Sequence, residues 1–159
     1  MKNVFVRTLI TLATTLMLVS SVEAHHSFSM FERVVQKVVT GTVERWAFNN
    51  PHSWLYINVK NPDGTETLWS FEGAAPPQLV GRGVTGNTFK PGETLTVMYC
   101  PLIDGRAGGA LGWIKKTDNT YVTPSDGGCR SDPDTIKRWE GWIEQGFRSN
   151  EEAPPVAGV

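Results

Sequence analysis

Short segments of alternating hydrophobic and polar residues, separated by turn residues, make up most of this chain. Residues 53–60 place leucine, isoleucine and valine on one face and Trp54, Tyr56 and Asn58 on the other. This period of two predicts a half-buried β-strand. Related patterns predict further strands over residues 34–48, 65–72, 94–101 and 111–116, with residues 120–123 continuing or capping the last one.

In two other segments the sequence pattern predicts helices. Residues 76–83 begin with two prolines and end at a glycine, which favours a short helix. Residues 133–147 carry apolar side chains at helical spacing behind Asp132, which predicts an amphipathic helix with a start at Asp132-Pro133. The glycine-rich residues 105–109 are predicted to form a hairpin turn, and Gly41 inside the first strand indicates a bulge or a barrel corner.

Five short strands with a helix between the third and the fourth are typical of a small β-barrel. The sequence therefore predicts a mainly β protein, a five-stranded OB-like β-barrel with a short helix and a C-terminal amphipathic helix. A β-sandwich is the alternative, although it usually has about seven strands.

The N-terminus has the order of a cleavable signal peptide. Lys2 and Arg7 are followed by an uncharged apolar run and then by Val22-Glu23-Ala24. The apolar run is roughly 13 residues long, short of the roughly 20 that a membrane-spanning helix needs. We expect cleavage after Ala24, export to the periplasm and no membrane span afterwards; an uncleaved anchor is the alternative.

The predicted signal peptide and secondary structure divide the chain into four parts. We expect a signal peptide at 1–24, a β-barrel domain at 25–128, a C-terminal helical extension at 129–150 and a disordered tail at 151–159. The formal net charge is −1 and no basic block is present, so nucleic acid is not an expected partner. An envelope protein remains a candidate partner.

Two cysteines are present, Cys100 and Cys129. In an exported protein an isolated pair is most simply one disulfide, worth roughly 3 kcal/mol in the chain-entropy model. It would fasten the C-terminal segment to the barrel. A two-thiolate metal site is the alternative, but the close spacing typical of such sites is missing.

The three histidines are His25, His26 and His52. After cleavage His25 would offer its α-amine and its ring nitrogen, a set that suits Cu(II) when an imidazole such as that of His52 is added. This arrangement is called a histidine brace, and His26 could act as an auxiliary ligand. The alternative is that His25 and His26 are a polar leader and that His52 is a turn residue packed on Trp54. The thioethers of Met30 and Met98 favour Cu(I), although a methionine more often fills a core.

No catalytic set stands out, so we expect a non-enzymatic protein. Ser53 and His52 are adjacent on a strand and point to opposite faces. Residues 105–109 lack the lysine and the strand–helix setting of a phosphate loop. Strand carboxylates are usually solvated, and this is what we expect for Glu32, Glu44, Glu66 and Glu72.

Four of the six tryptophans lie on consecutive predicted strands. On a shared outer face they would form a stacking platform for a small ligand, and on the inner face they would be core, which is the interpretation we favour. These residues are Trp46, Trp54, Trp69 and Trp113.

An ordered set of motifs resembles a family of small exported bacterial proteins known only as a domain of unknown function. It runs from Ala24-His25-His26-Ser27-Phe28 through Asn50-Pro51-His52-Ser53-Trp54 to Gly108-Gly109. The resemblance covers about residues 24–114 and implies export and a small β-barrel without supplying an activity. The segment from Cys129 through the Trp139–Trp142 helix is an extension beyond it.

The leading hypothesis is therefore an exported copper-binding or copper-carrier protein that uses His25, His52 and His26. The rival hypotheses are a periplasmic module that binds a small ligand or a protein through its tryptophan-rich face, and an accessory subunit of an exported enzyme complex.

Overall fold

The structure is a computed structural model that describes residues 27–155. A 3₁₀ helix, η2 (Ser27–Met30), leads into three antiparallel strands, and a short helix precedes two more strands and the C-terminal helix. The remaining elements are β1 (Lys37–Ala47), β2 (Ser53–Lys60), β3 (Glu66–Gly73), α2 (Pro76–Val80), β4 (Thr94–Pro101), β5 (Gly108–Lys116), β6 (Tyr121–Val122) and α3 (Pro133–Glu144).

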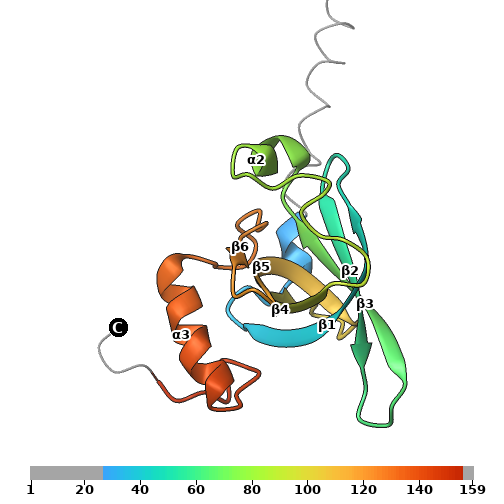
Figure 1. Cartoon of the computed structure of the whole chain (residues 1–159). Helices are drawn as coiled ribbons and strands as arrows, with labels where there is room; N and C mark the ends of the chain where they lie inside the picture. Colours follow the sequence, from blue (N-terminus) through green and yellow to red (C-terminus); the bar gives the residue numbers. More distant parts are fainter. Residues whose placement is uncertain (1–26, 156–159) are drawn as a thin grey trace, which may run out of the picture.

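Five of the strands close into a barrel (Figure 1). The sheet order is β3-β2-β1-β4-β5, and β3 also pairs with β5 in parallel, so the last strand meets the first. With α2 between β3 and β4, this is the predicted OB-like arrangement, and that prediction is confirmed. The two-residue strand β6 adds to β5.

Glycines make the closure possible at two places. A Cβ on Gly41 would stand 2.6 Å from the carbonyl oxygen of Asn58, so β1 crosses β2 more closely than any larger residue allows. Cβ atoms on Gly108 and Gly109 would stand 1.9 Å from Ser70 O and 2.1 Å from Cys100 O. The predicted turn therefore ends earlier than expected, because Gly108 and Gly109 belong to β5 and form the seam with β3.

Two apolar clusters hold the barrel and its extension together. Inside the barrel, inward-facing residues of every strand meet, with Leu55, Ile57 and Phe71 fully buried. Outside β4 and β5, α3 covers a second cluster that contains Trp113 and Trp139. In Figure 1, α3 lies along the flank of the barrel and α2 lies at one end.

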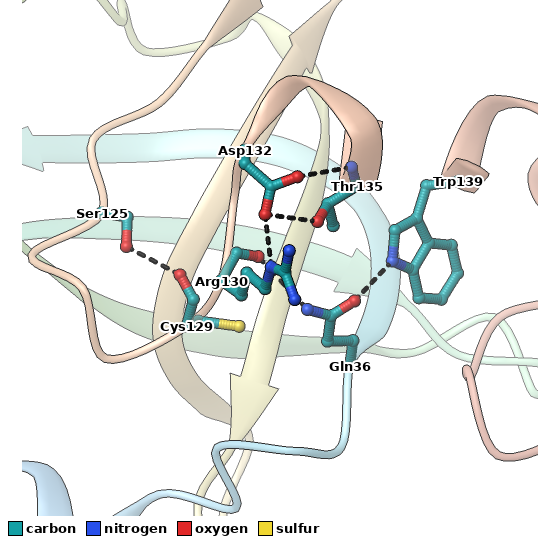
Figure 2. Close-up of polar contacts among 7 residues, drawn as sticks. All are labelled: Gln36, Ser125, Cys129, Arg130, Asp132, Thr135 and Trp139. Carbon is teal, nitrogen blue, oxygen red and sulfur yellow. Dashed lines mark hydrogen bonds and ion pairs between the residues drawn. The ribbon is translucent and has the colours of Figure 1, made fainter. Parts of the chain in front are cut away.

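The extension is fastened to the barrel by the predicted disulfide and by hydrogen bonds. Cys100 of β4 and Cys129 are joined by an S–S bond of 2.02 Å, which confirms the pairing. The Gln36 side chain accepts from Trp139 Nε1 at 3.0 Å and donates to the Arg130 carbonyl at 3.2 Å (Figure 2). Asp132 caps α3 through the Thr135 amide at 3.0 Å, so the predicted helix start is confirmed.

The remaining differences from the predicted elements lie at their ends. The first strand begins at Lys37 rather than at Val34, and Val34 is 81% exposed. The C-terminal helix ends at Glu144, just before Gly146 adopts a φ of 91°. Within residues 27–155, no helix is long and apolar enough to span a bilayer.

Candidate metal centre

His52 stands at the start of β2, where a buried serine fixes the backbone. Ser53 is fully buried, and its hydroxyl donates to the Ala74 carbonyl at 2.8 Å. Because neighbouring residues on a strand point to opposite faces, His52 lies on the outside of the barrel while Ser53 points inward. The imidazole keeps 31% of its side chain exposed.

Glu72 lies on β3 at the seam of the barrel. It pairs with Trp54 of β2 on one side and with Ala110 of β5 on the other. Glu72 is only 5% exposed, so the expectation that its carboxylate is solvated is wrong. Segments distant in the sequence, such as the loop that carries Asp126, pack against this part of the outer face. This long-range packing is not visible in the alternation of residues along the strand.

Asp126 comes from the loop that leads to the disulfide. Its Oδ1 accepts from the Gly128 amide at 2.8 Å, which fixes the carboxylate. The loop is held by Ser125, whose hydroxyl donates to the Cys129 carbonyl at 2.9 Å (Figure 2) and whose carbonyl accepts from Arg82 Nη1 at 2.7 Å. The side chain of Asp126 is 7% exposed.

These three side chains meet although they are far apart in the sequence. His52 Nδ1 is 3.0 Å from Glu72 Oε1 and 3.9 Å from Asp126 Oδ2. One ligand-type atom from each residue lies within 4.8 Å of the other two. His52 Nδ1 and Asp126 Oδ2 are both buried, and neither makes a hydrogen bond of good geometry within the described chain.

A proton on the imidazole accounts for only part of this arrangement. A protonated imidazole would form an ion pair with Glu72. Its Nδ1, however, is 3.9 Å from Asp126 Oδ2, which is too far for a hydrogen bond. A cation among the three side chains would satisfy both carboxylates. Two ligand atoms that are each about 2.1 Å from one ion are about 3.0–4.2 Å apart, depending on the angle. The two distances from His52 Nδ1, 3.0 and 3.9 Å, fall in that range.

The described chain begins next to this cluster. Phe28 of η2 packs on Gly128, where a Cβ would stand 2.9 Å from two carbons of the phenyl ring. Arg33 lies over the same ring at 5.4 Å and donates to the Gly127 carbonyl at 3.4 Å. The predicted ligands His25 and His26 lie outside the described residues. In the sequence, Ser27 directly follows His26 and directly precedes Phe28, whose ring touches the loop that carries Asp126.

Residues 14–111 match the family model described as "Family of unknown function (DUF6152)". The chain belongs to the DUF6152 family. No curated protein and no solved structure matches it. The DUF6152 match contains His25, His26, His52 and Glu72 but ends before Asp126 and Cys129. The part of the chain that follows the matched region thus supplies the third member of the cluster.

The four tryptophans of this DUF6152 protein do not share one face. Trp113 is fully buried beneath α3, and Trp46 and Trp69 are half-buried against the barrel core. Trp54 is half-buried on the outer face, 6.5 Å from Tyr56 between ring centroids. As the cross-strand neighbour of Glu72, Trp54 adjoins the cluster of His52, Glu72 and Asp126.

The two methionines also separate. Met98 is fully buried beside the disulfide, as expected for core filling. Met30 is 41% exposed at the end of η2, and its carbonyl accepts from the Ile103 amide at 2.9 Å. Sequence reasoning missed Asp126 altogether, because only its position three residues before Cys129 hinted that it would lie near the barrel.

Proposed function

We propose that this DUF6152 protein is an exported, non-enzymatic metal-binding protein that holds Cu(II) at His52, Glu72 and Asp126. In this proposal the N-terminal His25 completes the site through its amine and its ring, and His26 is an auxiliary ligand. The role is carriage, buffering or delivery of the metal to an envelope partner.

One observation carries the proposal: Asp126 Oδ2 is buried, faces His52 and has no hydrogen-bond donor among the described residues. Burying a carboxylate oxygen without a partner is costly, because the oxygen loses its hydration. A cation at this position removes the cost. Such unpartnered groups are retained where they have a task, and metal binding is a task that fits one imidazole and two carboxylates.

The N-terminal histidines are separated from Phe28 by one or two residues of the chain. Phe28 packs on Gly128, whose amide holds Asp126. Each residue of extended chain spans at most about 3.6 Å, so His25 is within about 11 Å of Phe28 along the backbone. That reach supports an N-terminal amine and imidazole joining the cluster from the side of η2.

The choice of Cu(II) follows from the ligand set. Amine and imidazole nitrogens together with carboxylate oxygens suit tetragonal Cu(II), which also has the highest affinity in the divalent series. Without the N-terminal nitrogens, one imidazole and two carboxylates would favour Cu(II) less. Cleavage after Ala24 is therefore part of the proposal, because only cleavage creates the amine.

Export has independent support from the disulfide. Cys100 and Cys129 are bonded, and such bonds persist mainly in oxidising compartments. The charged, apolar and small-residue order of residues 1–24 agrees with this. The periplasm is the proposed location.

The experiment is a Cu(II) titration of the mature chain beginning at His25, followed by competition with a chelator and by Trp54 fluorescence. We expect His52→Ala, Glu72→Gln and the addition of one residue before His25 each to weaken binding by more than about tenfold. Glu44→Gln is the matched control, because Glu44 is an exposed strand carboxylate that accepts from Asn58 at 3.0 Å. Equal affinity in the wild type and all four variants would refute the proposal.

A second candidate, binding of a small organic ligand, has one observation in its favour. A cleft of about 490 Å³ opens beside the barrel seam and is lined by Trp69, Tyr99, Lys37 and Arg106, among others. Burial raises the pKa of Tyr99 to about 12, so its hydroxyl remains a hydrogen-bond donor at physiological pH. Quenching of Trp69 by saccharides or peptides but not by Cu(II) would favour this function over the first.

A further inference from the structure

A hollow lies directly beside the metal cluster and has a different chemistry. It measures about 480 Å³ and is lined by Arg82, Arg130 and the loop that carries Asp126. Asp126 itself belongs to both the hollow and the cluster. Whatever binds in the hollow therefore adjoins the ion that the cluster is proposed to hold.

The two arginines of the hollow are not equivalent. Arg130 is paired through Nε with Asp132, so its charge is compensated locally. Arg82 donates through Nη1 to the carbonyls of Ser125 and Thr123, at 2.7 and 3.5 Å, and forms no ion pair within residues 27–155. A guanidinium has five donors, so Arg82 keeps several for a ligand.

The local charge depends on whether the cluster holds an ion. Without an ion, the carboxylate of Asp126 lines the hollow together with Arg82, and the carboxylate of Glu72 belongs to the same cluster as Asp126, so the two negative charges oppose the approach of an anion. A divalent ion neutralises both carboxylates and leaves the positive charge of Arg82 uncompensated. The hollow then becomes attractive to an anion.

We propose that this hollow binds a small oxyanion or carboxylate at Arg82, and that this anion and the metal ion strengthen each other's binding. The inference rests on the proposed metal site and adds a second ligand to it. Arg82 couples the two sites in a further way, because it holds the carbonyl of Ser125, the residue next to Asp126. By thermodynamic linkage, the anion must raise metal affinity by the same factor as the metal raises anion affinity.

The test uses sulfate as the probe and the mature chain with its disulfide intact. Cu(II) affinity is measured in sodium sulfate and in sodium perchlorate at one ionic strength and one pH. We expect binding about fivefold tighter in sulfate. Titration of sulfate into the copper-loaded and the metal-free protein should give the same ratio.

Variants separate a specific site from a general salt effect. Arg82→Gln should remove the difference between sulfate and perchlorate, and Arg82→Lys should retain part of it, because the charge remains. Arg148→Gln is the control, since Arg148 is an exposed arginine that donates to a backbone carbonyl, as Arg82 does, and does not line this hollow. It should behave like the wild type.

Three results would overturn the inference. Equal Cu(II) affinity in the two salts would show that no coupled anion site exists, while leaving the metal site intact. A sulfate effect that persists in Arg82→Gln would place the anion elsewhere. Failure of the wild-type chain to bind Cu(II) in either salt would refute the metal site and this inference together.

Discussion

Two carboxylates on strands of the same barrel illustrate how surroundings decide the role of a side chain. Glu44 of β1 is exposed and accepts from Asn58, whereas Glu72 of β3 is 5% exposed beside His52. Asp126 divides its two oxygens, because Oδ1 holds the loop and Oδ2 points at the cluster without a donor. The proposed ligand atom, Oδ2, is thus separate from Oδ1, the atom that stabilises the loop.

That division predicts the behaviour of Asp126→Asn. The amide oxygen can still accept from the Gly128 amide, so we expect the metal-free protein to melt within a few degrees of the wild type. Metal affinity should fall by more than about tenfold, because a charged ligand is lost. Thermal unfolding with and without Cu(II) measures both effects.

Asp104→Asn is the matched control for this variant, since Asp104 is an exposed aspartate that contacts Arg106. A large loss of metal-free stability in Asp126→Asn would contradict the account. It would mean that Asp126 and His52 form a structural ion pair.

At this scale the sequence predicted only part of the site. His52 stood out because histidines are few and because it sits in a turn before a regular strand. Glu72 looked like an ordinary strand carboxylate, since its burial depends on segments distant in the sequence. Asp126 had no local signature, because only the fold brings it to His52.

At the scale of elements, the loop 123–132 and the two segments it joins decide the geometry of the site. The loop begins after β6, contains Asp126 and Cys129, and ends at Asp132, the N-cap of α3. Its contacts with the rest of the chain include the disulfide, the Arg82 hydrogen bonds and the packing of Phe28 on Gly128. Changes in this loop should therefore alter metal binding, with or without a loss of stability.

Gly128→Ala tests the contact between η2 and the loop. Its new methyl group would stand 2.9 Å from the Phe28 ring and 3.0 Å from Asp126 Oδ1, so the ring or the carboxylate must shift. We expect Cu(II) affinity to fall towards that of the chain with one residue added before His25. Chelator competition measures the loss.

Gly81→Ala is the control for that substitution, because its methyl group would have only the Gln78 carbonyl near it, at 3.9 Å. Unchanged Cu(II) affinity in Gly128→Ala would show that η2 does not position a ligand.

Because Asp132 is the N-cap of α3, the stability of this helix should depend on pH. Its hydrogen bonds with Arg130 and the Thr135 amide lower the pKa of Asp132 to about 2. Because the folded pKa is depressed, the stabilisation is present above the unfolded pKa of about 3.9 and is lost as pH falls towards 2. Asp132→Ala should cost about 1 kcal/mol at pH 7 and less at pH 2. Urea unfolding at both pH values provides the measurement.

Asp132→Asn retains an acceptor for the Thr135 amide and should lose less stability than Asp132→Ala at pH 7. An equal gap between wild type and Asp132→Ala at both pH values would contradict a role for the ionised cap.

Elements were predicted best where local chemistry decides them. The bounds of β2 and β4 agree with the prediction, because alternation and flanking turn residues mark both. The start of β5 was wrong because Gly108 and Gly109 have the composition of a turn, yet the barrel needs them at a seam with no room for a Cβ. That requirement is tertiary and leaves no periodic signal.

For the molecule as a whole, the C-terminal extension is part of the barrel's structure and of the site. Trp139 and Trp142 of α3 pack in one cluster with Trp113 of β5 and with the disulfide. The loop between β6 and the extension brings Asp126 to residues of the DUF6152 region, and the disulfide at Cys129 fixes that loop. We therefore expect that the extension cannot be removed without loss of metal binding.

Removing the disulfide tests this integration. The double variant Cys100→Ala with Cys129→Ala should lose about 3 kcal/mol of unfolding free energy. Its metal affinity should fall as well, because the Asp126 loop is no longer fixed to β4. Unfolding curves and Cu(II) titration of the same preparation show whether both quantities change; a loss of stability with full Cu(II) affinity would contradict the link.

The central claim is that an N-terminal histidine, His52 and two carboxylates hold one copper ion in the exported protein. The most direct test is the intact native mass of the protein produced with its own N-terminal segment and purified from the periplasm without chelator. The account predicts a chain that begins at His25, is two hydrogens lighter because of the disulfide, and carries one copper. A chain of that mass that binds no copper even after a stoichiometric copper salt is added would contradict it.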